Sequence, residues 1–446
     1  MNNMIFSRDY DYEKISLFFL CSFLFFQFSL SFDDRLSFLS FYGLVHFFWL
    51  FTYFVFCSIS LRLRFGASII LITLYQLCCV LFLFSFYLTE VGNPLGINPV
   101  DAKFYDFVAN KTAELSLSES VAYVLSTHDS GELGFTLYLR FIYILPGDSI
   151  ANMKLANVIS HILSGIFVYK LVRLLDLNEN MAKLAFILFC MNPASVYFNA
   201  SGLKEPIFQL LVIITTYCCY RAIISRSVIF IAFSFLLSMA IGLFRTPYTI
   251  FFLLGFMLYV YMAAEGKLKS IVRLTSILLI PLLACIFWLS FQGAIQRLLG
   301  FDITLMQKER LGRDTVGIIE YIALTVAGFI GPVPTFNYES WNIETPLLTV
   351  QNYVKLVMSG FFLYSTYEAL KNRCLILYPI LVIYFLNMIM LIVSAATFDF
   401  RFIYPLMPLF YIILSYRFLD NPVFSRLWFW LYVILCFSFL ISYNLR

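Results

Sequence analysis

Near the start of a largely polar stretch, residues 91–132, the sequence reads Asn93-Pro94-Leu95-Gly96-Ile97-Asn98-Pro99-Val100-Asp101-Ala102-Lys103-Phe104-Tyr105-Asp106. Long hydrophobic runs lie on both sides of this stretch. The stretch and the residue before it hold excess carboxylate: seven acids (Glu90, Asp101, Asp106, Glu114, Glu119, Asp129 and Glu132) against two lysines (Lys103 and Lys111). An anionic cytoplasmic leaflet disfavours such a surface. The charge therefore predicts that this stretch lies on the outer side of a membrane.

The composition is that of a polytopic membrane protein. Of 446 residues, 61% are hydrophobic and only 13% are charged, whereas soluble domains carry about 25% charged residues. Runs of ~20 apolar residues, each long enough as a helix to cross ~30 Å of hydrocarbon, recur along the chain. We expect one all-α transmembrane domain over residues 1–446. The net charge of +4 comes without a basic stripe, so no nucleic-acid partner is predicted.

Apolar runs long enough to span predict thirteen transmembrane helices. They cover residues 15–32, 38–59, 67–88, 151–175, 182–198, 206–224, 228–244, 247–264, 271–291, 350–367, 374–396, 403–416 and 427–442.

Charge orients these spans. With the amino terminus inside, the inner tips hold sixteen Lys and Arg against eight acids, and the outer side holds the other fourteen bases and eighteen acids. Positively charged residues concentrate on the cytoplasmic side of membrane proteins. The arrangement predicts two large outer, periplasmic loops, residues 91–149 and 292–349.

Two further apolar segments are not counted as spans. Counting residues 318–336 would reverse the charge asymmetry downstream, and Gly328, Gly331 and Pro332 suit a broken helix. We predict a re-entrant or interfacial segment, which requires protein or water to satisfy its backbone. Residues 136–145 are too short to span and predict a second interfacial helix.

Asp101, Tyr105 and Asp106 are the first candidate site residues. If this piece is helical, Asp101 and Tyr105 share a face and Asp106 is turned away from Tyr105 by about 100°. Asp101 is the candidate general base, because a carboxylate can take a proton from an attacking hydroxyl, and Tyr105 and Asp106 are candidates for substrate binding. The alternative is that Asp101 follows Pro99 as a helix cap, since Asp is favoured at that position.

Lys204 and Glu205 precede Pro206 at the outer end of a predicted span. A Lys-Glu pair before a proline is ordinarily an exposed ion pair at a helix start. The functional hypothesis is that either residue faces a cavity and binds substrate phosphate or hydroxyl groups.

Arg245 and Arg401 stand at outer turns, each close to a proline that begins the next span. A guanidinium binds phosphate oxygens through two parallel hydrogen bonds, which makes both residues candidates for binding a lipid-linked phosphate. The alternative for each alone is an arginine that extends from a helix end to the interface. With Arg140 and Lys204 they form four candidate cations on the outer side.

The histidines and cysteines predict neither a metal site nor a cofactor. His46, His128 and His161 do not form a ligand cluster, and the ten cysteines lie within or at the ends of apolar runs without metal-ligand spacing. Such cysteines are typical of packing in an apolar core.

Several motifs resemble a known superfamily. Asp101-Ala-Lys-Phe-Tyr105, Gly134-Phe-Thr-Leu-Tyr138, and Asn192-Pro193 followed by Gly202-Leu-Lys204-Glu205 resemble the GT-C superfamily of membrane glycosyltransferases. Gly331-Pro332-Val-Pro334 followed by Glu344-Thr345 is similar to membrane proteins of bacterial surface-polysaccharide clusters, including O-antigen polymerases of the Wzy type. The chain departs in having three spans before the first large loop and no paired Arg-rich loops.

The resemblance implies transfer of a glycan from an undecaprenyl-linked carrier to a sugar hydroxyl at the periplasmic face of a bacterial inner membrane. Asp101 would deprotonate the acceptor and the cations would stabilise the departing phosphate. The expected function is O-antigen polymerase, with membrane lipid and a chain-length regulator as partners. Alternatives are a GT-C enzyme that adds a single sugar, a flippase or transporter, and a structural assembly protein.

Overall fold

A computed structural model describes residues 41–97, 99–127, 132–145, 149–225, 227–263, 317–331, 344–397, 399–418 and five positions between 431 and 438. The described residues form helices joined by short connections, without a strand. The helices are α2 (Phe41–Arg62), α3 (Phe65–Phe86), the π-helix η1 (Tyr87–Val91), α4 (Val100–Ala113), α5 (Leu117–Thr127), α6 (Leu133–Tyr143), α7 (Ser149–Leu174), α8 (Glu179–Cys190), α9 (Pro193–Ala200), α10 (Glu205–Ile224), α11 (Val228–Gly242), α12 (Thr246–Ala263), α16 (Ile318–Ile330), α17 (Glu344–Lys371), the 3-10 helix η3 (Leu375–Leu377), α18 (Tyr378–Val393), α19 (Phe400–Ile403), the 3-10 helix η4 (Tyr404–Leu406) and α20 (Met407–Phe418).

Ten of the thirteen predicted spans coincide with these helices, and the other three (residues 15–32, 271–291 and 427–442) lie wholly or mostly outside the described residues. By length and composition, four helices can cross a membrane: 44–62, 65–91, 149–174 and 375–393. The bent pair α8 and α9 makes a fifth if it is one span. The fold is thus consistent with a polytopic membrane protein, and the number of thirteen stays a prediction.

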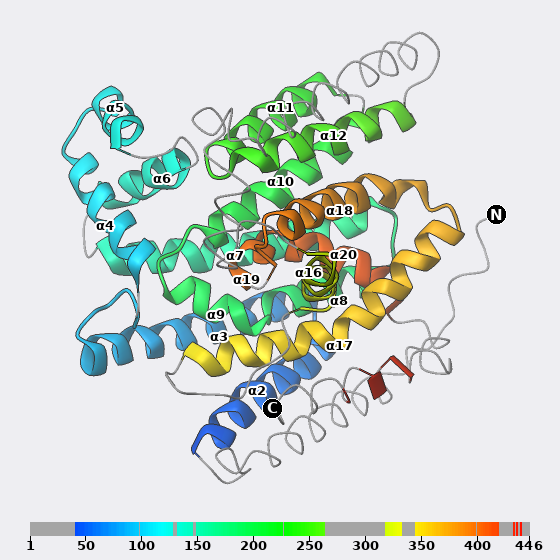
Figure 1. The fold of residues 1–446 in the computed structure, drawn as a ribbon, viewed down its shortest axis with the longest axis horizontal. Helices are drawn as coiled ribbons and strands as arrows, with labels where there is room; N and C mark the ends of the chain where they lie inside the picture. The colour runs from blue at the N-terminus through cyan, green and yellow to red at the C-terminus, as the bar shows by residue number, and fades with distance from the viewer. Residues whose placement is uncertain are drawn as a thin grey trace.

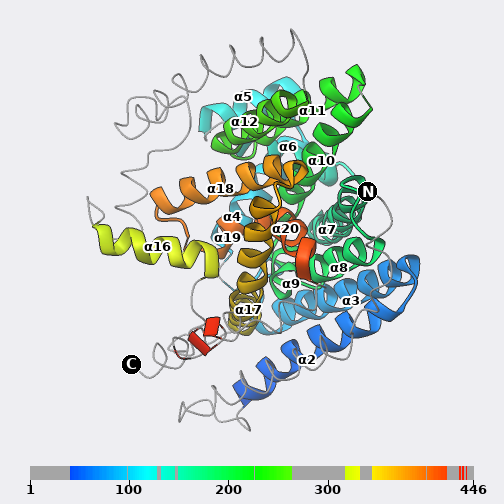
Figure 2. The ribbon, with the colours of Figure 1, turned by 90° about the vertical axis from the view of Figure 1, so that its right-hand side faces the viewer.

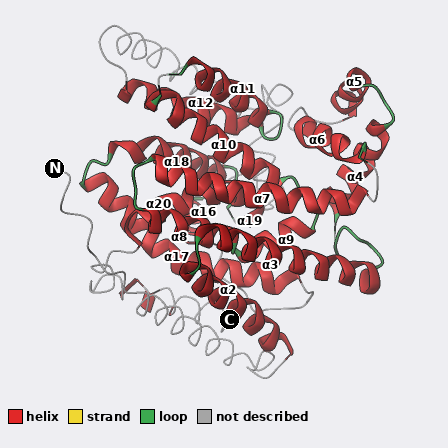
Figure 3. Cartoon of the chain, turned by 180° about the vertical axis from the view of Figure 1, so that it is seen from behind, coloured by secondary structure: helices red, strands yellow, loops and turns green. Residues whose placement is uncertain are grey.

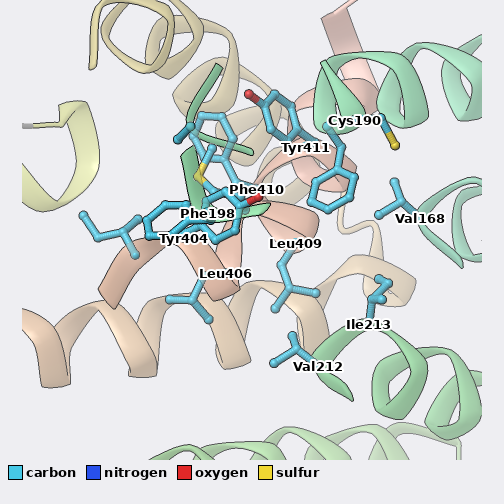
Figure 4. Packing of buried hydrophobic residues seen from close by; sticks show 14 of the residues in the cluster. Val168, Cys190, Phe198, Val212, Ile213, Tyr404, Leu406, Leu409, Phe410 and Tyr411 are labelled. Atoms are coloured by element: carbon cyan, nitrogen blue, oxygen red, sulfur yellow. The ribbon is translucent and has the colours of Figure 1, made fainter. Parts of the chain in front are cut away.

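Helix α20 lies at the centre of the bundle. Every residue from Ile403 to Leu414 is buried, and α20 packs against α7, α8, α10, α17 and α18 (Figure 1). Figure 4 shows Leu409 and Phe410 of α20 among side chains from α9 and α10. A helix that is apolar on all sides is stable only when other elements surround it, which explains its central position.

The predicted span over residues 182–198 is not one helix, because α8 and α9 meet at a bend of 50°. Asn192 caps α9 by accepting from the Ala194 N–H, and Pro193 follows as its first residue. The break leaves the Cys190 carbonyl without its helical partner, and Gln76 Nε2 of α3 donates to it at 2.8 Å. A buried carbonyl requires such a donor, so a polar residue on α3 stabilises the bend.

Helices α4, α5 and α6, which we call the outer helical group, lie together at one end of the molecule (Figures 1 and 3). They occupy most of the first predicted loop, residues 91–149. Val108, Val124 and Leu133 form a small core of their own. The predicted interfacial helix over residues 136–145 corresponds to α6.

Helix α16 begins at the start of the segment predicted to be re-entrant. Its 13 residues span about 20 Å, less than the ~30 Å of hydrocarbon. Figure 1 looks nearly down its axis while α17 runs across the view, and Figure 2 shows α16 from the side, so the two cross at a steep angle. Lys355 Nζ of α17 donates to the Gly328 carbonyl at 2.8 Å. The membrane placement of this segment stays a prediction.

Candidate active site

Helix ends that the predicted topology assigns to the outer side come together in the structure. The beginnings of α4, α10, α17 and α19 and the connections after α9 and α11 all contribute side chains to one polar region. Because the first and last of these segments are 300 residues apart, only the folded chain brings them into contact.

Asp101 lies in the first turn of α4 and forms an ion pair with Arg401. The residue at the N-cap position is Pro99, and no side chain caps this helix. The capping alternative for Asp101 is therefore wrong. The Asp101 side chain is 44% exposed, so a substrate can reach it.

Arg401 is held by two carboxylates. Its guanidinium pairs with Asp101, and its Nε lies 3.7 Å from Asp399 Oδ2. Asp399 also caps α19 by accepting from the Arg401 N–H at 2.9 Å. This turn fixes the backbone of Arg401, so the guanidinium is directed toward α4.

Arg245 and Arg401 approach the same aromatic ring. The guanidinium carbon of Arg245 lies 4.4 Å from the centre of the Phe402 ring, and that of Arg401 lies 5.2 Å from it. Arg245 also donates to Glu205 Oε1 at 3.0 Å. The two predicted phosphate-binding residues are therefore neighbours, each paired with a carboxylate.

Lys204 and Glu205 do not form the exposed pair that their adjacency suggests. Lys204 Nζ contacts both carboxylate oxygens of Glu132 at 2.8 Å, whereas Glu205 pairs with Arg245. Glu205 is 1% exposed and Lys204 is 7% exposed. The exposed-pair alternative is wrong, because the turn directs the two side chains to different elements.

Tyr105 joins the Lys204 pair. Its hydroxyl donates to Glu132 Oε2 at 2.7 Å, and Lys204 Nζ lies 5.7 Å from the centre of its ring. Burial lowers the pKa of Lys204, an effect opposed by the Glu132 charge. Burial and the same carboxylate raise the pKa of Tyr105. Glu132, which the sequence analysis did not select, thus connects the outer helical group to the start of α10.

Asp106 points away from Tyr105, as the helical spacing predicts. Its Oδ1 accepts from the Tyr143 hydroxyl at 2.6 Å and from Asn110 Nδ2 at 3.2 Å. Both contacts lie within the outer helical group, because Asn110 is on α4 and Tyr143 is on α6. The structure does not bring Asp106 to the side of α4 that faces Arg401.

Arg140 has a structural environment. Its Nε donates to the Thr112 carbonyl at 3.0 Å and its Nη2 to the Leu115 carbonyl at 2.7 Å. Cations at a helix C-terminus satisfy carbonyls that have no helical partner. Arg140 therefore ties the end of α4 to α6, and the structure does not place it with the other three candidate cations.

A cavity of about 190 Å³ adjoins the Asp101–Arg401 pair. Its lining residues are Leu95, Gly96, Ile97, Pro99, Val100, Asp101, Ala102, Tyr197, Ser201, Leu203, Glu344 and Arg401. Three polar members, Tyr197, Ser201 and Glu344, were not selected as site residues from the sequence. Tyr197 lies within a predicted span, where an aromatic residue is ordinarily assigned to packing, and only its position before the Ser201 turn hinted at a site.

Three buried polar atoms around the ion pairs, Glu205 Oε2, Arg245 Nη1 and Arg401 Nε, have no hydrogen-bond partner among the described residues. Buried polar groups are nearly always paired. Other such atoms occur throughout the described helices, and these three differ in lying beside the ion pairs, where a polar ligand can bond to them. In the described part of the chain, no group of three or more His, Cys, Asp or Glu side chains is placed to hold a metal ion.

Comparison with known proteins gave one similarity. No curated protein and no solved structure matched the chain. One family model matched a part of the chain, residues 144–315, which contains Lys204, Glu205 and Arg245 but not Asp101 or Arg401. Residues 144–315 match the family model described as Mannosyltransferase (PIG-V), a family of GT-C-type membrane glycosyltransferases, and the match supports glycosyltransferase activity.

Proposed function

We propose that this protein transfers a single sugar from a polyprenyl-phosphate carrier to a hydroxyl group of an acceptor glycan. Mannose is the first sugar to test, because the matching family is one of mannosyltransferases. The proposed site lies on the outer face of the membrane, which is the periplasmic face if the protein resides in a bacterial inner membrane. Undecaprenyl is then the carrier.

One observation carries the proposal: Asp101 and Arg401 pair beside a polar cavity in a bundle whose core is largely hydrophobic. Ionisable residues at membrane depth or at the ends of buried helices are costly, and they mark substrate sites. The pair places a candidate base next to a candidate phosphate-binding residue.

The proposed reaction uses these groups as follows. The Asp101 carboxylate takes the proton of the acceptor hydroxyl while the hydroxyl oxygen attacks the anomeric carbon of the donor. The bond from that carbon to the phosphate oxygen breaks, and its electron pair leaves with the phosphate. Arg401 and Arg245 stabilise the charge that develops on the phosphate, an electrostatic effect that is commonly large in enzymes.

The Asp101–Arg401 ion pair also links binding of the donor phosphate to the availability of Asp101 as a base. A donor phosphate competes with Asp101 for Arg401, because both are anions and the guanidinium has a limited number of donors. Binding of the donor would release Asp101 from its pair and leave it available as a base. Arg401 Nε and Arg245 Nη1, which lack hydrogen-bond partners among the described residues, supply further donors.

The family match favours transfer of one sugar over polymerisation of whole repeat units. O-antigen polymerase, with a chain-length regulator as partner, remains the alternative that the motif Gly331-Pro332-Val-Pro334 suggests. A deletion strain distinguishes the two by its lipopolysaccharide gel pattern. A full ladder with altered serology indicates transfer of a side-branch sugar, and a core with one repeat unit indicates a polymerase.

The direct test uses purified protein in lipid vesicles with short-chain polyprenyl-phosphate mannose or glucose, radiolabelled in the sugar, and the glycan from the deletion strain as acceptor. We expect label to move to the glycan and bare polyprenyl phosphate to appear in equal amount. Movement of intact donor across the bilayer without transfer would overturn the proposal in favour of a flippase.

A further inference from the structure

Glu344 is a second carboxylate in the cavity that contains Asp101. It is the first residue of α17, which begins at the same end of the molecule as the outer helical group (Figure 1). Asp101 and Glu344 come from separate elements and lie on walls of one cavity of about 190 Å³. A water molecule takes up ~30 Å³ of the liquid, so the cavity has room for a larger polar group.

The polypeptide segment before α4 closes directly over Glu344. The Ile97 N–H donates to Glu344 Oε1 at 3.3 Å. A side-chain carbon added to Gly96 would lie 3.1 Å from the same oxygen, and Gly96 has φ of +130°, a conformation that favours glycine. The backbone therefore approaches this carboxylate closely and fixes its position.

Replacing Glu344 with glutamine, which has nearly the same shape, can separate a role in anchoring the segment before α4 from a role that needs the negative charge. Glu344 lies in the first turn of α17, where a negative charge interacts favourably with the helix dipole, and it anchors the segment through Ile97. Glutamine keeps the shape and the acceptor oxygen for Ile97 but removes the charge. A role in anchoring alone thus survives the Glu344→Gln change, whereas a role that needs the charge does not.

We propose that Glu344 binds hydroxyl groups of the donor sugar and so determines which sugar the site accepts. Carboxylates accept hydrogen bonds from hydroxyls more strongly than neutral groups do. Glu344 lines the cavity with Tyr197, Ser201 and Arg401, which supplies both polar partners for a sugar ring and, at Arg401, a cation for the attached phosphate. The inference rests on the proposed function and specifies the sugar-binding side of the same site.

The test measures binding rather than turnover. Purified wild-type protein and Glu344→Gln in detergent are titrated with short-chain polyprenyl phosphate, alone and carrying mannose or glucose. We expect wild type to bind one sugar ester more tightly than the bare phosphate. Glu344→Gln should lose about ten- to hundredfold in affinity for that ester, the range for a hydrogen bond to a charged group, and keep its affinity for the bare phosphate.

Two controls keep the outcomes distinct. Glu114→Gln changes an exposed glutamate at the end of α4 and should match wild type, and Arg401→Lys should weaken both ligands. If Glu344→Gln does not fold, Glu344→Asp keeps the charge but moves it by one methylene and should still lose the sugar preference. Retention of that preference in the folded variant overturns the inference, whereas a wild type that prefers no sugar ester overturns the proposed function.

Discussion

Neighbouring residues in this sequence serve different partners in space. Lys204 reaches Glu132 in the outer helical group, and Glu205 reaches Arg245 at the connection between α11 and α12. Both pairs are partly or wholly buried, so loss of one member leaves the other charge without compensation, which is more costly than loss of a surface pair. The site is therefore a set of interdependent charges.

At Asp101 we expect the substitution to asparagine to reduce glycan transfer by about 10²- to 10⁴-fold, because asparagine cannot take a proton from the acceptor. Membrane abundance should stay at the wild-type level. The assay is transfer of labelled sugar in vesicles, with immunoblotting of the membrane fraction. Asp106→Asn is the matched control, since Asp106 lies on the same helix and bonds to Tyr143 instead. Equal losses in both variants would mean that the substitutions disturb α4 and that the loss does not come from removing the base.

At Arg245 and Arg401 the change to lysine keeps the charge and removes the planar fork of donors. We expect each variant to lose about ten- to hundredfold in transfer rate, the range for one or two hydrogen bonds to a charged group. Arg62→Lys, at the exposed end of α2, should behave as wild type in a complementation assay. Wild-type activity from both site variants would contradict the phosphate-binding role and favour the alternative, arginines that extend to the membrane interface.

At the scale of elements, the outer helical group is docked on the connection between α11 and α12 through a glycine. The Gly134 N–H at the start of α6 donates to the Leu243 carbonyl at 2.8 Å. A side-chain carbon on Gly134 would lie 2.5 Å from the Phe244 ring. This close approach positions α6 beside Arg245, the next residue in the chain.

Gly134→Ala should therefore lower the free energy of unfolding by about 1–3 kcal/mol, the usual cost of overpacking, and reduce transfer as Arg245 is displaced. Thermal unfolding in detergent measures the first effect and the vesicle assay the second. Combining Gly134→Ala with Phe244→Leu should recover part of both losses, because the smaller side chain leaves room for the added methyl group. Gly66→Ala, where no atom lies within 4 Å of the added carbon, is the control.

At the scale of the whole molecule, the structure agrees with the sequence in separating helix ends into two sets. The site residues occupy one set, and Lys183 of the other set donates to the carbonyls of Leu61, in the last turn of α2, and of Leu63, in the connection to α3. Which set faces the outside is predicted from the charge asymmetry of sixteen bases and eight acids at the predicted inner tips.

A reporter fused after Ser118, on the exposed part of α5, should be active only outside the cytoplasm. The same reporter fused after Asp176, in the turn between α7 and α8, should show the opposite activity. If the Ser118 fusion is active inside the cytoplasm and the Asp176 fusion outside it, the topology is reversed. The whole site would then lie on the wrong face for a lipid-linked donor on the outer leaflet.

The sequence by itself determined the class of protein and most of its helices, because a run of ~20 apolar residues has one stable arrangement in a bilayer regardless of its neighbours. Its helical spacing also predicted that Asp101 and Asp106 face different directions. It did not predict the bend between α8 and α9. Asn192-Pro193 begins α9 locally, but the carbonyl that the break exposes is satisfied by Gln76, which is far away in sequence.

Only the tertiary structure decided which charges meet. Nothing in the local sequence of Asp101 specifies Arg401, 300 residues away, and nothing near Glu132 distinguishes it from a surface carboxylate. Glu344 was noted only as part of a motif, without a role in a site. The physical reason is that a buried charge is stabilised by a partner in space, and the partner is chosen by how the helices pack. The sequence therefore identified Asp101, Lys204, Glu205, Arg245 and Arg401 as candidates, while the packing of α4, α10, α17 and α19 brought them together and added Glu344.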